Sequence, residues 1–196
     1  MARSGMGNSD SELAVRAGGG DADAFGELVE QHAAAARRLA RGILDNPQDA
    51  DDAAQDGFLA AWRHIDRYRP ERPFGPWLMK IVINAARDLR RKRTVRQVLP
   101  LGDHVPGEGR TPEETTDQAL LREALKKGLA DLPERQRLAL LMHDIEGYSH
   151  AEVADTLGCP EGTARSLVFH GRRHLREGLG AFASAGRPPG PEPKAG

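Results

Sequence analysis

The most informative polar side chains of this sequence lie between Gly162 and Glu177, where arginine recurs at helical spacing and no acidic residue intervenes. One face of a helix over this stretch would present Arg165, Ser166, Phe169, His170, Arg172, Arg173 and Arg176. Near a helix start, a guanidinium group such as that of Arg165 can donate two hydrogen bonds to a guanine edge, and arginines further along can neutralise phosphates. The pattern predicts a helix that lies in the major groove of DNA. The alternative is a solvated basic helix end, where arginine complements the helix dipole.

The residues before this face predict the element that would position it. Ser149 with Glu152 three residues later forms a capping box, which opens a short helix that Gly158 ends. Pro160 suits the first turn of a second helix over about 160–179, with its apolar side at Ala164, Val168, Gly171, Leu175 and Leu179. Two helices joined by a tight glycine turn make a helix-turn-helix. Because cap, turn and basic face agree, DNA binding is favoured over the solvated-helix alternative.

Two further polar faces occur in the first half of the chain. Residues 45–56 contain five Asp and no basic residue, and a helix over about 48–64 would place Asp49, Asp52 and Asp56 on one face beside Gln55. Such uncompensated charges repel one another, which favours a basic partner surface over an acidic helix start that only complements the dipole. A third helix, over about 77–93, carries the polar stripe Lys80, Asn84, Arg87 and Arg91, whose alternative is an ordinary solvated face.

The elements around these faces predict an all-α fold of two small helical domains, the C-terminal one a helix-turn-helix. Helices over about 22–44, 48–64 and 77–93, with a proline-rich loop at 68–76, make the first domain, 10–98. Helices over about 117–130 and 134–145, the latter with Leu138, Leu141, Met142 and Ile145 inward, precede the helix-turn-helix in the second domain, 117–182. Pro and Gly at 99–116 predict a flexible, mildly acidic linker, so that the spacing of the two domains varies in the free protein. A Pro/Gly-rich tail, 183–196, is expected to be disordered.

Composition removes several classes of function. The net charge is -1, so a nucleic-acid partner rests on local charge alone, and the single Cys159 excludes an internal disulfide. His170 and His174 stand four apart near Cys159 in sequence, but no closing ligand completes a zinc site, and we expect neither metal nor cofactor. No paired acid and base or phosphate loop suggests an enzyme. The N-terminus lacks an apolar signal region and no stretch approaches the roughly 20 apolar residues that span a bilayer, so a cytoplasmic protein without membrane insertion is expected.

Three stretches resemble the extracytoplasmic-function (ECF) sigma factors of bacterial RNA polymerase. Residues 129–177, with a Leu-Pro step, a Gly-Tyr-Ser step and Gly-Thr before the basic helix, resemble region 4 of that family. The segment DADDAAQDGFLAAW at 49–62 resembles region 2.2, and FGPWLMKIVINAARDLRRKR at 74–93 resembles regions 2.3 and 2.4. With the helices between them, the matches cover roughly two thirds of the chain in the family's order.

The resemblance implies a transcription initiation factor that binds core RNA polymerase and promoter DNA, with a separate anti-sigma factor as a further candidate partner. It implies that Asp49, Asp52, Gln55 and Asp56 dock on the β′ coiled coil, that region 4 contacts the β flap, and that the seven residues of the basic helix read the -35 element. Lys80, Asn84, Arg87 and Arg91 would face the -10 element. The closest rival is a stand-alone helix-turn-helix regulator, which leaves both N-terminal faces unexplained.

Some assignments within the resemblance stay open. In the family the loop at 67–75 captures a flipped base, so Tyr68 would either stack on that base or pack on the helices, while Arg67, Arg69 or Arg72 would hold phosphates. Phe58, Trp62 and Trp77 are assigned to the core. Leu167 and His170 stand where family recognition helices commonly carry Arg, which changes the expected affinity or sequence preference at the -35 element.

Overall fold

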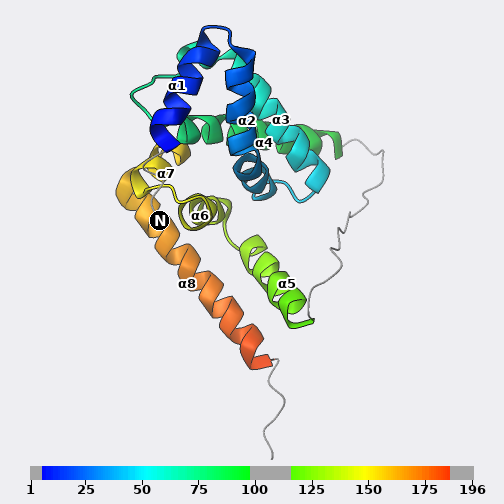
Figure 1. Ribbon diagram of the computed structural model, residues 1–196. Helices are drawn as coiled ribbons and strands as arrows, with labels where there is room; N and C mark the ends of the chain where they lie inside the picture. The colour runs from blue at the N-terminus through cyan, green and yellow to red at the C-terminus, as the bar shows by residue number, and fades with distance from the viewer. Residues whose placement is uncertain (1–5, 98–115, 186–196) are drawn as a thin grey trace, which may run out of the picture.

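The computed structural model describes residues 6–97 and 116–185, and in these ranges all regular structure is helical (Figure 1). Except for Thr116, the predicted linker lies outside the described residues, as does the predicted tail beyond Ala185. Within the described ranges no helix has the length and apolar character needed to cross a membrane.

The first domain contains α1 (Met6–Gly18), α2 (Ala22–Arg41), α3 (Pro47–Arg63), the 3-10 turn η1 (Ile65–Arg67) and α4 (Phe74–Gln97). The side chain of Asp21 caps α2 by accepting a hydrogen bond from Ala24 N, and Asn46 caps α3 with Pro47 in its first turn. The predicted loop is wrong for Phe74–Pro76, which form the first turn of α4. Proline is tolerated there because the first amides of a helix have no intrahelical acceptor.

The sequence interpretation missed α1, whose Leu13, Ala14 and Ala17 are buried. Beneath it, the core of the first domain is built from the facing sides of α2, α3 and α4, where Leu28, Leu39, Leu78 and Val82 are fully buried. The contact of α3 with α4 is the most extensive between any two elements of the described chain, and Gly57 of α3 lies directly against Val82 of α4. A Cβ at Gly57 would lie 2.7 Å from Val82 Cγ2, so only glycine lets the two helices approach this closely.

The second domain contains α5 (Thr116–Ala130), α6 (Glu134–Leu140), η2 (Leu141–Ile145), α7 (His150–Leu157) and α8 (Glu161–Ala185). The helix predicted over 134–145 changes at Leu141 into the wider π-helical turn η2. That change rotates the following side chains, and Ile145, predicted to point inward, is 61% exposed. Helix α8 runs to Ala185, past its predicted end and into the start of the predicted tail.

The two domains lie against one another rather than apart. Their buried side chains form one continuous cluster, to which the second domain contributes Leu138, Met142, Tyr148 and Val153. In the contact between the two domains, η2 packs against α2, and α7 packs against α4. Helix α8 extends away from the first domain (Figure 1). The expectation of a variable spacing considered only the composition of the linker, and it left out the apolar and ionic contacts that the folded domains make with each other.

Candidate nucleic-acid and polymerase interfaces

The helix-turn-helix has the predicted construction. Ser149 Oγ accepts a hydrogen bond from Glu152 N at 3.2 Å and the Glu152 carboxylate accepts one from Ser149 N at 2.7 Å, which completes the capping box. Gly158 ends α7 in the left-handed region at φ 61°. Ala164 and Val168 anchor α8 in the core, so its opposite face turns to solvent.

All seven residues predicted for the -35 face lie exposed on α8: Arg165, Ser166, Phe169, His170, Arg172, Arg173 and Arg176. Phe169 is 62% exposed, with its ring 5.3 Å from that of His170 in an edge-on arrangement. An exposed aromatic side chain among arginines suits contact with the thymine methyl group or a base edge. The structure brings these side chains together on one surface.

Three of the α8 arginines already have carboxylate partners. Arg165 donates to Glu161 Oε1 at 2.6 Å, Arg173 Nε lies 3.7 Å from Glu177, and Arg172 donates to both oxygens of Asp144. The hydrogen bonds that Arg172 donates to Asp144 raise the pKa of Arg172. These exposed pairs are weak in water, so phosphates can replace the carboxylates with little loss.

A histidine pair borders the same surface. The rings of His143 and His150 lie 4.1 Å apart, and His143 Nδ1 is 2.7 Å from the carbonyl oxygen of Tyr148. Burial, then the charge of His143 and that of Arg165, lower the pKa of His150. Folding therefore favours the neutral form of His150, the first residue of α7.

The acidic face of α3 differs from the prediction at one position. Asp52, Gln55 and Asp56 are exposed as expected. Asp49 is not, because its side chain is only 5% exposed and it accepts a hydrogen bond from Arg93 of α4. Placing Asp49 on the docking face is therefore wrong. Helical periodicity could not reveal that Arg93, which is half exposed, covers this carboxylate and joins the start of α3 to the end of α4.

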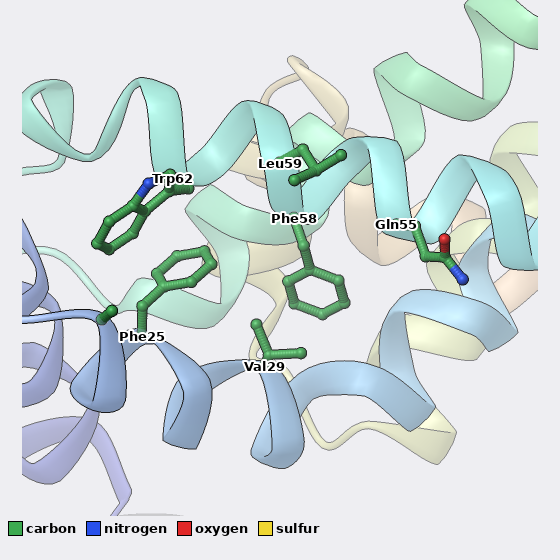
Figure 2. A pocket seen from close by; sticks show the side chains of 7 residues that line it. Phe25, Val29, Gln55, Phe58, Leu59 and Trp62 are labelled. Carbon is green, nitrogen blue, oxygen red and sulfur yellow. The ribbon is translucent and has the colours of Figure 1, made fainter.

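An apolar hollow of about 430 Å³ adjoins this acidic face (Figure 2). It lies between α2 and α3 and is lined by Ala22, Phe25, Val29, Gln55, Phe58, Leu59 and Trp62. Figure 2 shows Phe25 and Trp62 turned toward each other, and their ring centroids are 4.9 Å apart. Sequence reasoning missed Leu59, which is 51% exposed; an apolar residue that continues the spacing of Asp52, Gln55 and Asp56 was the available signal. The hollow makes the α3 face partly apolar as well as acidic.

The polar stripe on α4 is present but partly engaged by the second domain. Asn84 and Arg91 are exposed, with Arg91 bonded to Asp88. Arg87 donates to Glu134 of α6 at 2.9 Å, and Lys80 Nζ lies 3.4 Å from the carbonyl oxygen of Asp155 in α7. Two of the four stripe residues therefore contact the second domain, although Lys80 remains exposed and Arg87 is half-buried.

Tyr68 packs on the helices, the second of the two roles left open for it. Its side chain is buried, its ring lies 5.3 Å from Phe74 and 5.5 Å from Trp77, and its hydroxyl donates to the carbonyl oxygen of Arg72 at 2.7 Å. Burial raises the pKa of the Tyr68 phenol. The base-stacking role is wrong for this conformation, because the ring is already enclosed by two aromatic neighbours. Arg67, Arg69 and Arg72 remain exposed around it.

Comparison with known proteins places both domains in one family. Residues 28–96 match the family Sigma-70 region 2, and residues 122–175 match Sigma-70, region 4. These matches fall within the two predicted domains, in the predicted order. A stand-alone helix-turn-helix regulator is not favoured, because it would have no use for the region 2 match.

Individual relatives agree with this. The chain is 37% identical to the ECF RNA polymerase sigma factor SigM of Mycobacterium tuberculosis over 88% of its own length and 85% of the relative. It is 38% identical to SigE of Mycolicibacterium smegmatis over 81% of its own length, and spans 62% of that protein. Among solved structures it is similar to the sigma factor RpoE in complex with the anti-sigma factor NepR from Bartonella quintana, with a TM-score of 0.66, 26% identity, and coverage of 80% of this chain and 96% of that one.

Proposed function

Because this chain belongs to the ECF sigma factors of RNA polymerase, we propose that it binds core polymerase in the cytoplasm and directs it to a specific set of promoters. In this proposal the first domain holds the melted -10 element and the second reads the -35 element. The function is non-enzymatic: the chain supplies recognition, and the polymerase supplies the chemistry.

The observation that carries the proposal is the exposed face of α8 behind a capped helix-turn-helix. A recognition helix reads bases with residues near its N-terminus. Arg165 and Ser166 lie in its first turns, whereas Arg172, Arg173 and Arg176 lie further along. We assign base contacts to the first pair and phosphate contacts to the other three.

The α3 face supports a second assignment, docking on polymerase. Asp52 and Asp56 offer charge to a basic surface, and the hollow beside Gln55 offers apolar area to the same partner. A surface that is both charged and hollowed suits a helix with basic and apolar residues. Asp49 does not contact the partner in this proposal. Its role is to accept the hydrogen bond from Arg93 that ties α3 to α4.

For the -10 element we assign Lys80, Asn84, Arg87 and Arg91 on α4, with Arg67, Arg69 and Arg72 as phosphate ligands in the loop before it. Tyr68 serves this site by filling the space behind the loop. An anti-sigma factor is a further partner that we propose from the likeness to RpoE, which was solved with NepR.

Transcription with purified core polymerase tests the whole proposal. Sequencing the DNA that the chain retains together with core polymerase should yield promoters with two common elements, and those promoters should be transcribed only when the chain is added. Core polymerase that starts at the same sites without the chain would contradict the proposal.

Charge reversal tests the docking face. Asp52→Lys with Asp56→Lys should weaken binding to core polymerase, since the inferred partner is basic. The control, Glu12→Lys with Glu27→Lys, makes the same charge change at exposed positions of the first domain that do not line the hollow. Equal affinity of the two double variants in a pull-down titration would remove the docking assignment.

Two arginine substitutions test the recognition helix. Arg165→Ala should relax sequence preference at one -35 position and cost about 1–3 kcal/mol of binding free energy there. Arg173→Ala should weaken all sequences alike and reduce the salt dependence by about one counterion. Equal losses from both changes on every promoter would remove the base-reading role of Arg165.

A further inference from the structure

Two histidines stack at the edge of the α8 recognition surface. His143 of η2 and His150 of α7 are both half-buried, and their ring centroids lie 4.1 Å apart with 37° between the ring planes. Nδ1 of His143 lies 2.7 Å from the carbonyl oxygen of Tyr148. Because a carbonyl oxygen only accepts, Nδ1 of His143 carries a hydrogen, and its Nε2 is the atom left to gain a proton.

The charged residues beside this histidine stack form two neutral pairs. Arg165 of α8 donates to Glu161 at 2.6 Å. Arg172 of α8 donates to Asp144 of η2 at 2.9 Å. Glu161, Arg165 and Arg172 are all close enough to influence the pKa of His150. With both rings neutral, this group of side chains therefore has no net charge.

The other charges on α7, and those that reach it from α4 and α6, have partners outside the stack. Glu152 is engaged in the capping box, and Asp155 accepts hydrogen bonds from Arg72. Lys80 Nζ of α4 lies against the carbonyl oxygen of Asp155, and Arg135 of α6 donates to a carbonyl oxygen at the end of α7. The proton balance of the stack therefore depends chiefly on the two neutral pairs.

The free chain disfavours a proton on His150. Burial, then the charge of His143 and that of Arg165, lower its pKa. A phosphate at this edge would add negative charge beside the arginines and the rings, and a nearby anion favours the charged form of a histidine. Binding of the phosphate and binding of the proton would then strengthen each other.

We propose that the His143–His150 stack is a proton-linked phosphate site, which contacts the DNA backbone beside the bases that α8 reads and takes up a proton when the duplex binds. The inference rests on the proposed function, because it takes α8 as the helix that lies in the major groove. The phosphate displaces Asp144 from Arg172, and a proton from solvent joins a ring nitrogen and balances the added charge. Since the two rings are so close, the stack takes up one proton rather than two.

Duplex binding measured against pH tests the site. The probe is a labelled duplex of about twenty base pairs of mixed sequence, because a phosphate contact does not depend on sequence. The affinity of the parent chain should rise about tenfold from about pH 8 to about pH 6. Calorimetry at about pH 6.5, in two buffers of different ionisation enthalpy, should report the uptake of about one proton for each duplex bound.

Three variants assign the proton to the stack. His150→Gln should take up no proton, and its affinity should change less than about threefold over the same pH range. His150→Arg carries a permanent charge, so it should bind at about pH 8 as tightly as the parent chain does at about pH 6. His64→Gln makes the matched change at an exposed position of the first domain and should keep the parent's pH dependence. Circular dichroism at each pH separates lost binding from unfolding.

His170 provides the competing source of a proton, because it is exposed on the same face of α8. His170→Gln should keep the proton uptake. Uptake that persists in His150→Gln and disappears in His170→Gln would overturn the assignment. A parent chain whose duplex affinity does not change with pH would overturn it as well.

The transcription assay separates this inference from the proposed function. A chain that directs core polymerase to promoters but binds the duplex without proton uptake keeps the proposed function and loses the histidine site. A chain that binds the duplex with proton uptake but has no effect on polymerase keeps the histidine site and loses the proposed function.

Discussion

Gly57→Ala should destabilise the first domain through a single contact. The new Cβ would lie 2.7 Å from Val82 Cγ2 and 3.0 Å from Val82 Cα. Rotating the valine relieves the first clash but not the second, because the second atom is backbone. Overpacking of this kind costs about 1–3 kcal/mol, and replacing a helical glycine by alanine returns about 1 kcal/mol. The expected net change runs from about zero to about 2 kcal/mol of lost unfolding free energy.

Gly26→Ala separates the two contributions. Gly26 lies in α2, is exposed, and a Cβ there would meet nothing within 4 Å. This variant should gain about 0.5–1 kcal/mol from helix propensity alone. In urea unfolding, the free energy of unfolding of Gly57→Ala should therefore be about 1–3 kcal/mol lower than that of Gly26→Ala. Adding Val82→Ala to Gly57→Ala should reduce the destabilisation that the clash causes. Equal stabilisation by the two alanines would refute the close contact between α3 and α4.

Three further changes test the local structure by urea unfolding. Asp49→Ala should cost about 1.5–3 kcal/mol because it leaves Arg93 without its carboxylate, and a stability equal to the parent's would return Asp49 to the docking face. Ser149→Ala should cost about 0.5–2 kcal/mol by removing the acceptor for Glu152 N, and no change would mean that the cap contributes nothing. The lowered pKa of His150 means that the unfolded chain binds its proton more tightly, so stability should be complete above about pH 6.5 and fall as the pH drops below it. His150→Gln should flatten that fall, and an unchanged pH profile would contradict the assignment.

Local chemistry made the helix-turn-helix predictable. The capping box of Ser149 and Glu152 and the left-handed turn at Gly158 depend on neighbours within a few residues, so sequence spacing describes them fully. The exposed face of α8 follows from the same periodicity. The two polar faces of the first domain were also visible, since they too lie along single helices.

The errors come from contacts between distant segments or from local departures from a regular helix. Asp49 has the spacing of an exposed residue, yet Arg93 lies over it across the domain. For Tyr68 the sequence left base stacking and packing on the helices both open, and the contacts of its ring with Phe74 and Trp77 decide for packing. Ile145 follows a helical period that η2 interrupts. In each case the decisive neighbour is not near enough in sequence, or regular enough, for periodicity to reveal it.

The joining of the two domains could not be predicted for the same reason. Gly75 is required because the ring of Tyr148 from the second domain packs against it, where a Cβ would lie 2.6 Å from the hydroxyl oxygen. The ion pair of Arg38 with Glu146 joins residues that are 108 positions apart in the sequence. Charge composition showed an acidic and a basic surface and assigned both to outside partners. The structure shows that two carboxylates of the second domain accept hydrogen bonds from arginines of the first: Asp155 from Arg72, and Glu134 from Arg87.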